Sequence, residues 1–224
     1  MDNCEIRYGG HDNFDIVRAI NIINSSPTIN NCHFFKNSQS MRIGGLSAVP
    51  TISNNTFEED TWAPIELDLG TNPIFSTNEF VNNTYNAVGI TSLSYNADNY
   101  TLSKLDIANN TNVAYVHQSN IVIGDQSTLT IEPGVVIKPT SSRNSFWTIN
   151  GTLIAEGTID EPIVWTSLHD DSFGGDTNNN ADATSPGPGH WRSIAFNASS
   201  GSTCLLYTSP SPRDLSTSRM PSSA

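Results

Sequence analysis

Short runs of alternating apolar and polar residues recur along the chain, and Asn, Gly and Pro separate them. Thr28-Ile29-Asn30 and Val88-Gly89-Ile90 are two such runs. Alternation with a period of two predicts short β-strands, and the intervening residues predict the turns between them. No segment holds the helical period of 3.6 over the roughly ten residues that a helix needs, which excludes helical repeats.

Three segments align without gaps: SPTINNCHF, VPTISNNTF and NPIFSTNEF, with prolines 23 residues apart at positions 27, 50 and 73. The shared columns are Ile29, Ile52 and Phe75; Cys32, Asn55 and Asn78; and Phe34, Phe57 and Phe80. A further apolar column is predicted at Ile20, Ile43, Leu67 and Ile90. A fixed period of this length indicates a stack of structural repeats.

Strand-rich repeats without a leucine ladder predict a parallel β-helix with about 23–24 residues per coil. Equivalent residues then stack about 4.8 Å apart. Ile29, Ile52 and Phe75 form an inward apolar ladder. Asn55 and Asn78 form an amide ladder, in which each side chain bonds to its neighbour.

The repeats divide the chain into regions. We expect β-helix coils over residues 1–95, an irregular transition over 96–120 and further coils over 121–203, in which Leu129 and Leu153 are equivalent. An acidic loop at 167–191 interrupts the last coils, between Trp165 and Trp191. Residues 204–224 have no repeat register, and we expect a disordered tail there.

The segments LTIEPGVVIK, GTLIAEGTIDEPIVWTS, DDSFGGDTNNN and PGPGHW resemble right-handed parallel β-helix repeat proteins that are secreted or anchored at bacterial surfaces. The resemblance implies the fold and an exported location, and it covers roughly residues 3–200. It leaves the function open, because the fold carries lyases, hydrolases and adhesins. The tail from Cys204 resembles a translated sequencing adapter. The chain starts directly on strand and turn residues, so we expect a fragment of a longer protein without end caps.

The charge of the chain narrows the choice of partners. Its 224 residues carry 22 acidic and 10 basic side chains, for a net charge of −12. Nucleic acid requires a basic surface and is excluded, as is an anionic membrane surface. No apolar run reaches the roughly 18 residues of a membrane span, so membrane insertion is not expected. We expect a secreted or cell-surface protein whose partner is a polysaccharide or surface glycan.

The acidic loop is the candidate metal site, because oxygen ligands at every second residue suit Ca²⁺. Its candidate ligands are Asp170, Asp171, Asp176, Asn178, Asn180 and Asp182. Counted from Asp176, the loop has Ala181 and Gly187 where an EF-hand has glycine and glutamate, so it is not an EF-hand. A solvated surface loop and a catalytic role are the alternatives, and His169 and His190 flank the loop.

No complete catalytic motif is present. Asp170-Asp171 resembles one of the four elements of β-helix polysaccharide hydrolases, and the other three are missing. A lyase would need carboxylates and a basic residue on one face, and no acidic cluster is expected in the register of Arg18 and Arg42. The favoured function is therefore a non-catalytic structural or adhesive module that binds glycan or calcium. A fragment of a polysaccharide lyase or glycoside hydrolase is the alternative.

Two cysteines share a local pattern. Cys4 and Cys32 both follow an asparagine, which places them at equivalent positions on adjacent coils. The spacing of coils lies within the range that a disulfide spans. A disulfide and a pair of stacked free thiols both remain open.

Overall fold

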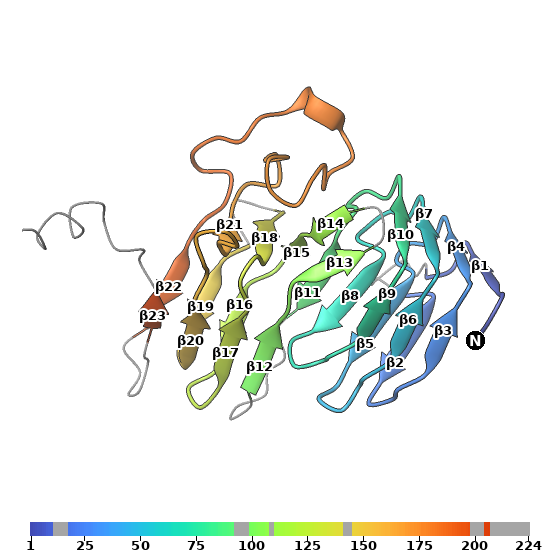
Figure 1. Ribbon diagram of the computed structural model, residues 1–224, viewed down its shortest axis with the longest axis horizontal. Helices are drawn as coiled ribbons and strands as arrows, with labels where there is room; N and C mark the ends of the chain where they lie inside the picture. The colour runs from blue at the N-terminus through green and yellow to red at the C-terminus, as the bar shows by residue number, and fades with distance from the viewer. Residues whose placement is uncertain (11–17, 92–98, 108–109, 141–144, 198–203, 207–224) are drawn as a thin grey trace, which may run out of the picture.

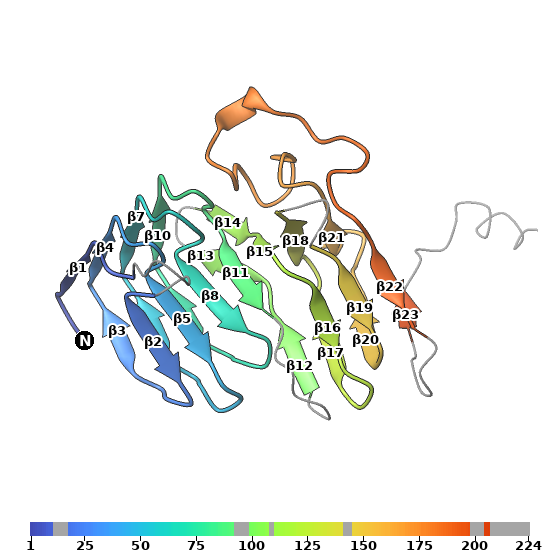
Figure 2. The same ribbon diagram turned by 180° about the vertical axis from the view of Figure 1, so that it is seen from behind.

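The computed structural model describes residues 1–10, 18–91, 99–107, 110–140, 145–197 and 204–206. Short strands stack side by side along one long axis, with the N-terminal coil and strands β22 and β23 at its opposite ends (Figures 1 and 2). Apart from one 3-10 turn, η1 (Ala181–Ala183), the described regular elements are all strands. The chain is a parallel β-solenoid, as the repeats predict.

One sheet of seven strands runs along the whole solenoid, and every neighbouring pair in it is parallel. In spatial order its strands are β2 (Ile20–Ile23), β5 (Met41–Gly44), β8 (Ile65–Asp68), β11 (Val88–Thr91), β15 (Tyr115–His117), β18 (Val136–Pro139) and β21 (Val164–Trp165).

Shorter sheets complete the coils. The N-terminal half has β1 (Glu5–Arg7), β4 (His33–Phe35), β7 (Thr56–Glu58) and β10 (Glu79–Val81) in one sheet, and β3 (Thr28–Asn30), β6 (Thr51–Ser53) and β9 (Ile74–Ser76) in another. The C-terminal half has β12 (Asn99–Leu102), β17 (Thr128–Ile131), β20 (Thr152–Ala155) and β23 (Cys204–Leu206), and also β16 (Ile121–Ile123), β19 (Trp147–Ile149) and β22 (Ile194–Phe196).

The region between the two halves contains an antiparallel pair, β13 (Leu105–Ile107) and β14 (Asn110–Val113). Strands β12 and β15 on either side of it join the parallel sheets. Residues 96–98 and 108–109 of the predicted transition, and residues 207–224 of the predicted tail, lie outside the described residues.

The apolar ladders form the core. Ile29 pairs with Ile52, and Ile52 with Phe75. Phe34, Phe57 and Phe80 follow one another in the same way, and the rings of Phe34 and Phe57 stack with centroids 4.7 Å apart. Leu129 pairs with Leu153 in the wider coils. The predicted register is confirmed for these columns, with 23 residues per coil in the first two and 24 between Leu129 and Leu153.

The fourth predicted column is wrong at its first member. Ile22, rather than Ile20, pairs with Ile43, and the column continues through Leu67 to Ile90. Ile20 pairs with Met41 instead. Both isoleucines point inward because they are two residues apart on one strand. The shorter connection between β2 and β5 shifts the register by two residues.

Two buried ladders of polar side chains hold the turns together. Asn55 Oδ1 accepts from the Cys32 amide and Asn78 Oδ1 from the Asn55 amide, at 2.9 and 3.1 Å, which confirms the predicted ladder. A second ladder was not predicted. In it Asn37 N–H donates to Asp60, and Asp60 N–H donates to Asn83, each at 2.9 Å. Each buried polar group is thus bonded by the next coil, which offsets its desolvation.

Trp147 belongs to the core and is completely buried. Its indole Nε1–H donates to Nε2 of His117 at 3.0 Å, and Nδ1 of His117 lies 2.9 Å from the carbonyl of Ser119. His117 is therefore the neutral tautomer with its proton on Nδ1. Burial lowers the pKa of His117 to about 4, although the bond to Ser119 acts in the opposite direction.

Candidate functional site

The acidic loop is docked on the solenoid. Trp147 pairs with Ile194 on the next coil, and the equivalent pair Asn150 and Asn197 is 47 residues apart, so the loop supplies the additional length. Figure 1 shows the loop, in orange, on one side of the stack. The Asn86 amide, just before β11, donates to the carbonyl of Thr177 at 2.8 Å. The loop therefore reaches back across several coils.

Small residues make this docking possible. Leu168 of the loop packs in a cluster with Ala63, Ala87 and Val116. Gly174 has a positive φ of 70°, and a Cβ there would stand 3.0 Å from Cβ of Ala114. A side chain at position 174 would be strained and would lift the loop off the sheet.

Lys138 fixes the loop electrostatically. It lies on the outer face of β18, yet the loop buries it completely. Its Nζ donates to Thr177 Oγ1 at 2.8 Å and to the carbonyl of Gly175 at 3.0 Å. Burial lowers the pKa of Lys138 to about 8, and the negative charges of Asp171, Asp170 and Asp176 limit that fall. The sequence-based interpretation missed this residue, because an outward lysine on a strand usually faces solvent.

The predicted calcium ligands have varied surroundings. Asp170 accepts from Thr166 Oγ1 and Ser172 Oγ, each at 2.5 Å, and burial acts to raise its pKa, but these bonds outweigh it and lower the pKa. The two carboxylate oxygens of Asp176 accept from the amides of Asn180 and Ala181, at 3.0 and 2.8 Å. These bonds shape the loop.

The remaining candidates do not complete a cage. The Oδ1 atoms of Asn178 and Asn180 are buried and have no hydrogen-bond donor among the described residues. Asp182 lies in η1, and its side chain is outside the described part. No three His, Cys, Asp or Glu side chains within the described ranges converge as a metal site. Lys138 offsets part of the negative charge of Asp170, Asp171 and Asp176. Calcium binding stays a prediction.

The two histidines that flank the loop meet. The rings of His169 and His190 are perpendicular, with centroids 5.0 Å apart. Nδ1 of His190 lies 2.9 Å from Ser167 Oγ, and it also accepts from the Gly187 amide at 3.2 Å. Ser167 is buried, so this pair closes the base of the loop and does not present a nucleophile to solvent.

The outer face of the seven-stranded sheet carries a charged group that sequence reasoning excluded. Glu66 is the register partner of Arg42, and it forms an ion pair with Arg18. Asp68, two residues along the same strand, accepts from Arg42 at 2.8 Å. The expectation that no acidic residues share this register is therefore wrong. The predicted alignment of Ile43 with Leu67 already places Arg42 beside Glu66, and only the relation of Arg18 to β8 was obscured by the misplaced Ile20.

A small hollow lies on the same outer face. Glu66, Gly89 and Val116 are register neighbours on β8, β11 and β15, and they line a cavity of about 180 Å³. Trp62 stands at one side of it, and its ring packs at 89° against Tyr85 with centroids 4.8 Å apart. Gln118 and Ser119 lie at the rim, and both are exposed. Neither Trp62 nor Glu66 belonged to the predicted site.

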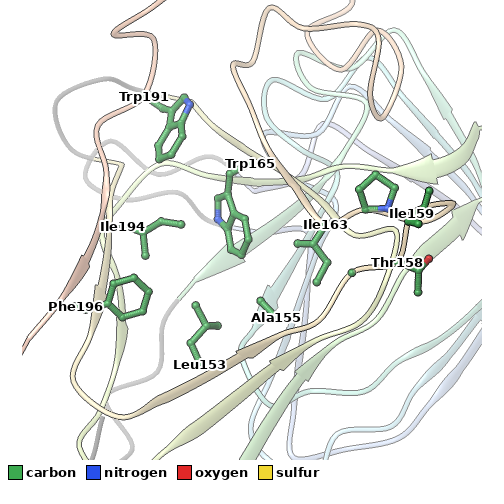
Figure 3. Close-up of a pocket in the computed structure, with 11 residues that line it drawn as sticks. Leu153, Ala155, Thr158, Ile159, Ile163, Trp165, Trp191, Ile194 and Phe196 are labelled. Carbon is green, nitrogen blue, oxygen red and sulfur yellow. The ribbon is translucent and has the colours of Figure 1, made fainter. Parts of the chain in front are cut away.

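A second cavity, of about 670 Å³, has a different origin. Figure 3 shows Leu153, Trp165, Ile194 and Phe196 around it. Trp165, Ile194 and Phe196 are the last described members of their columns. Leu153 is followed only by Cys204 of β23. The cavity is therefore the open end of the core. Core packing of Trp165 is only partial, and its buried Nε1–H has no acceptor among the described residues.

Cys4 and Cys32 occupy equivalent positions, since the Sγ of each donates to the carbonyl two residues before it, at 3.4 and 3.1 Å. Both are free thiols, and Cys32 is buried. Of the two alternatives left by the sequence, the structure has the stacked thiols.

No protein-family model matches the chain, and comparisons with curated proteins and with solved structures find no match either. The described part of the chain also has no helix with the length and apolar character needed to cross a bilayer.

Proposed function

We propose that the chain is a non-catalytic β-solenoid module of a secreted or cell-surface protein, and that it binds glycan on its outer faces. The supporting observation is the outer face of β3, β6 and β9. Its register columns are Thr28, Thr51 and the exposed Ile74, and then the polar column Asn30, Ser53 and Ser76. Uncharged amides and hydroxyls suit the hydroxyls of a sugar chain, and the parallel stacking repeats them at regular intervals.

The pairing of charges on the long sheet supports a non-catalytic role. Asp68 is almost entirely buried and is bound by Arg42, while Arg18 binds Glu66. A general acid or base must exchange protons with a substrate that it can reach. These ion pairs instead neutralise the face, which leaves it suited to binding.

A panel of soluble polysaccharides tests the proposal. We expect slower migration of the protein in native gels that contain the recognised glycan, with no new reducing ends and no unsaturated products in solution. Cleavage of any member would favour the enzyme. A protein that neither binds nor cleaves any member would overturn the glycan part of the proposal.

A lyase or hydrolase fragment is the second candidate, and one observation favours it. Glu66 and Asp68 share an outer face with Arg18 and Arg42, which is the combination of carboxylates and basic residues that such chemistry requires. If the panel reveals cleavage, Glu66→Gln and Asp68→Asn separate the roles of these groups. An enzyme that uses Glu66 would lose turnover in the first variant while it still binds the polymer.

A further inference from the structure

We propose that the hollow beside Trp62 binds one uncharged pyranose residue of a glycan chain. This inference rests on the proposed function and gives it a site and a ligand class. The hollow is bounded by Trp62, Glu66, Gly89, Val116, Gln118 and Ser119.

The floor of the hollow exists because position 89 has no side chain. Gly89 lies between Glu66 on β8 and Val116 on β15 in the register of the sheet. A Cβ at Gly89 would meet Glu66 Cγ, the Ile65 carbonyl and Trp62 Nε1, each at 3.5 Å. These are ordinary contact distances, and the backbone of Gly89 does not have a positive φ. The chain could therefore hold a larger residue there, and glycine leaves the space open.

The wall of the hollow offers an oriented aromatic ring. Trp62 is half-buried, and its perpendicular contact with Tyr85 fixes the plane of the indole. Trp62 also packs against the cluster that contains Leu168 of the acidic loop. A rigid, partly exposed indole suits the apolar C–H face of a sugar ring. Because the indole is already fixed, it loses little conformational freedom when the sugar binds.

The rim of the hollow provides hydrogen bonds without a net charge. Glu66 is held by Arg18, so the carboxylate can accept from hydroxyls while the pair as a whole stays neutral. The exposed Gln118 offers both a donor and an acceptor, and Ser119 offers a hydroxyl. A cationic sugar would be repelled by Arg18, the basic member of this pair. A uronate would be repelled by Glu66 and by the overall charge of −12. The rim therefore favours a neutral pyranose.

The docked loop encloses one side of this site. Val116 forms part of the floor and also lies under Leu168. Lys138, its register neighbour on β18, is already covered by the loop. The bound residue would therefore lie at the edge of the loop, and the rest of the polymer would extend over β8 and β5.

The experiment measures the affinity of the whole chain for a soluble β-glucan, a mannan, a galactan and polygalacturonate by affinity electrophoresis. Two variants change the site: Trp62→Ala removes the ring, and Gly89→Val fills the floor while it retains Trp62. Trp191→Ala is the matched control, since Trp191 is a half-buried tryptophan at the open end of the core. Thermal melting verifies that each variant is folded.

We expect a neutral polymer to bind, and each site variant to weaken that binding by about tenfold while the control leaves it unchanged. If the wild type binds and both site variants bind equally well, the site is wrong and the proposed function stands. If the wild type binds polygalacturonate alone, the ligand class is wrong. If it binds none of the polymers, the proposed function fails together with the site. Because Trp62→Ala also removes a packing contact, a folded Gly89→Val that binds normally overturns the site by itself.

Discussion

Neutral His117 holds the side chain of Trp147 through its unprotonated Nε2. Its folded pKa of about 4 lies below the ordinary value of about 6.5. The contribution of His117 to the free energy of unfolding is therefore at its maximum above about pH 6.5. It decreases by roughly 3 kcal/mol as the pH falls toward 4. Urea unfolding at a series of pH values measures the loss.

The variant His117→Gln isolates this effect, because an amide can still accept from Trp147 and donate to Ser119. We expect its unfolding free energy to fall less between pH 6.5 and 4 than that of the wild type. Equal pH dependence of the two proteins would show that other groups, such as surface carboxylates, cause the loss.

The amide ladder is the second feature at the scale of single residues. Asn55→Ala leaves the Cys32 N–H and the Ile29 carbonyl without their partners in a buried turn. We expect the free energy of unfolding to fall by about 3 kcal/mol, the cost of two unsatisfied buried groups. In urea unfolding, the exposed Asn21→Ala should change it by less than about 0.5 kcal/mol. Equal losses would mean that the ladder is solvated.

Among the elements, the acidic loop and β18 depend on one another through Lys138. Lys138→Met removes the donor to Thr177 and Gly175 and leaves Asp170, Asp171 and Asp176 without their cation. We expect faster amide hydrogen exchange in the loop and at Asn86, whose N–H bonds to Thr177. Lys104→Met, which affects an exposed ion pair with Glu161, is the control and should leave these amides unchanged.

Calcium and Lys138 compete for the same carboxylates if the predicted metal site exists. We therefore expect added Ca²⁺ to raise the melting temperature of Lys138→Met by more than that of the wild type, with Mg²⁺ as the control ion. An equal rise in melting temperature for the wild type and the variant would show that the lysine and the ion do not share a site.

The sequence predicts elements well where the signal is local and repeated. Ile29, Ile52 and Phe75 share a 23-residue period with their prolines, and the structure pairs them. The signal for the second ladder was also present, because Asn37, Asp60 and Asn83 have the same spacing. Ile20 and Ile22 both satisfy the strand pattern, so periodicity alone could not decide which of them pairs with Ile43.

The sites were less predictable because they depend on contacts between distant parts of the chain. Nothing next to Lys138 indicates that a later loop covers it. The hollow joins Trp62 to Ser119 through the register of three strands, and no local pattern links residues so far apart in the chain. Composition indicated an acidic loop, but only the stacking of the coils shows that this loop contacts Lys138 of β18.

At the scale of the whole molecule, the open end of the core exposes apolar surface. Phe196 is 46% exposed, and Trp165 and Ile194 next to it are half-buried. We expect reversible self-association through this end, and we expect it to increase with salt because screening weakens the repulsion between chains of charge −12. Sedimentation at several salt concentrations measures it.

Phe196→Ser should reduce this association at little cost in stability. Val122→Ser is the control, since Val122 is an exposed apolar residue on the outer face of β16, away from the end. If both variants lower association equally, general surface hydrophobicity is responsible and the open end has no special role.

The bond between Asn86 and Thr177 has a mechanical consequence. In a simple solenoid each coil touches only its neighbours, so a pulling force peels the coils away one after another. Here the loop that follows β21 is fastened at the start of β11, and Lys138 anchors it at β18 between those two strands. The coils from β11 to β21, which this loop spans, would unfold together in one large step. The coils on the N-terminal side would still unfold one at a time. The docked loop therefore makes this part of the solenoid resist stepwise extension.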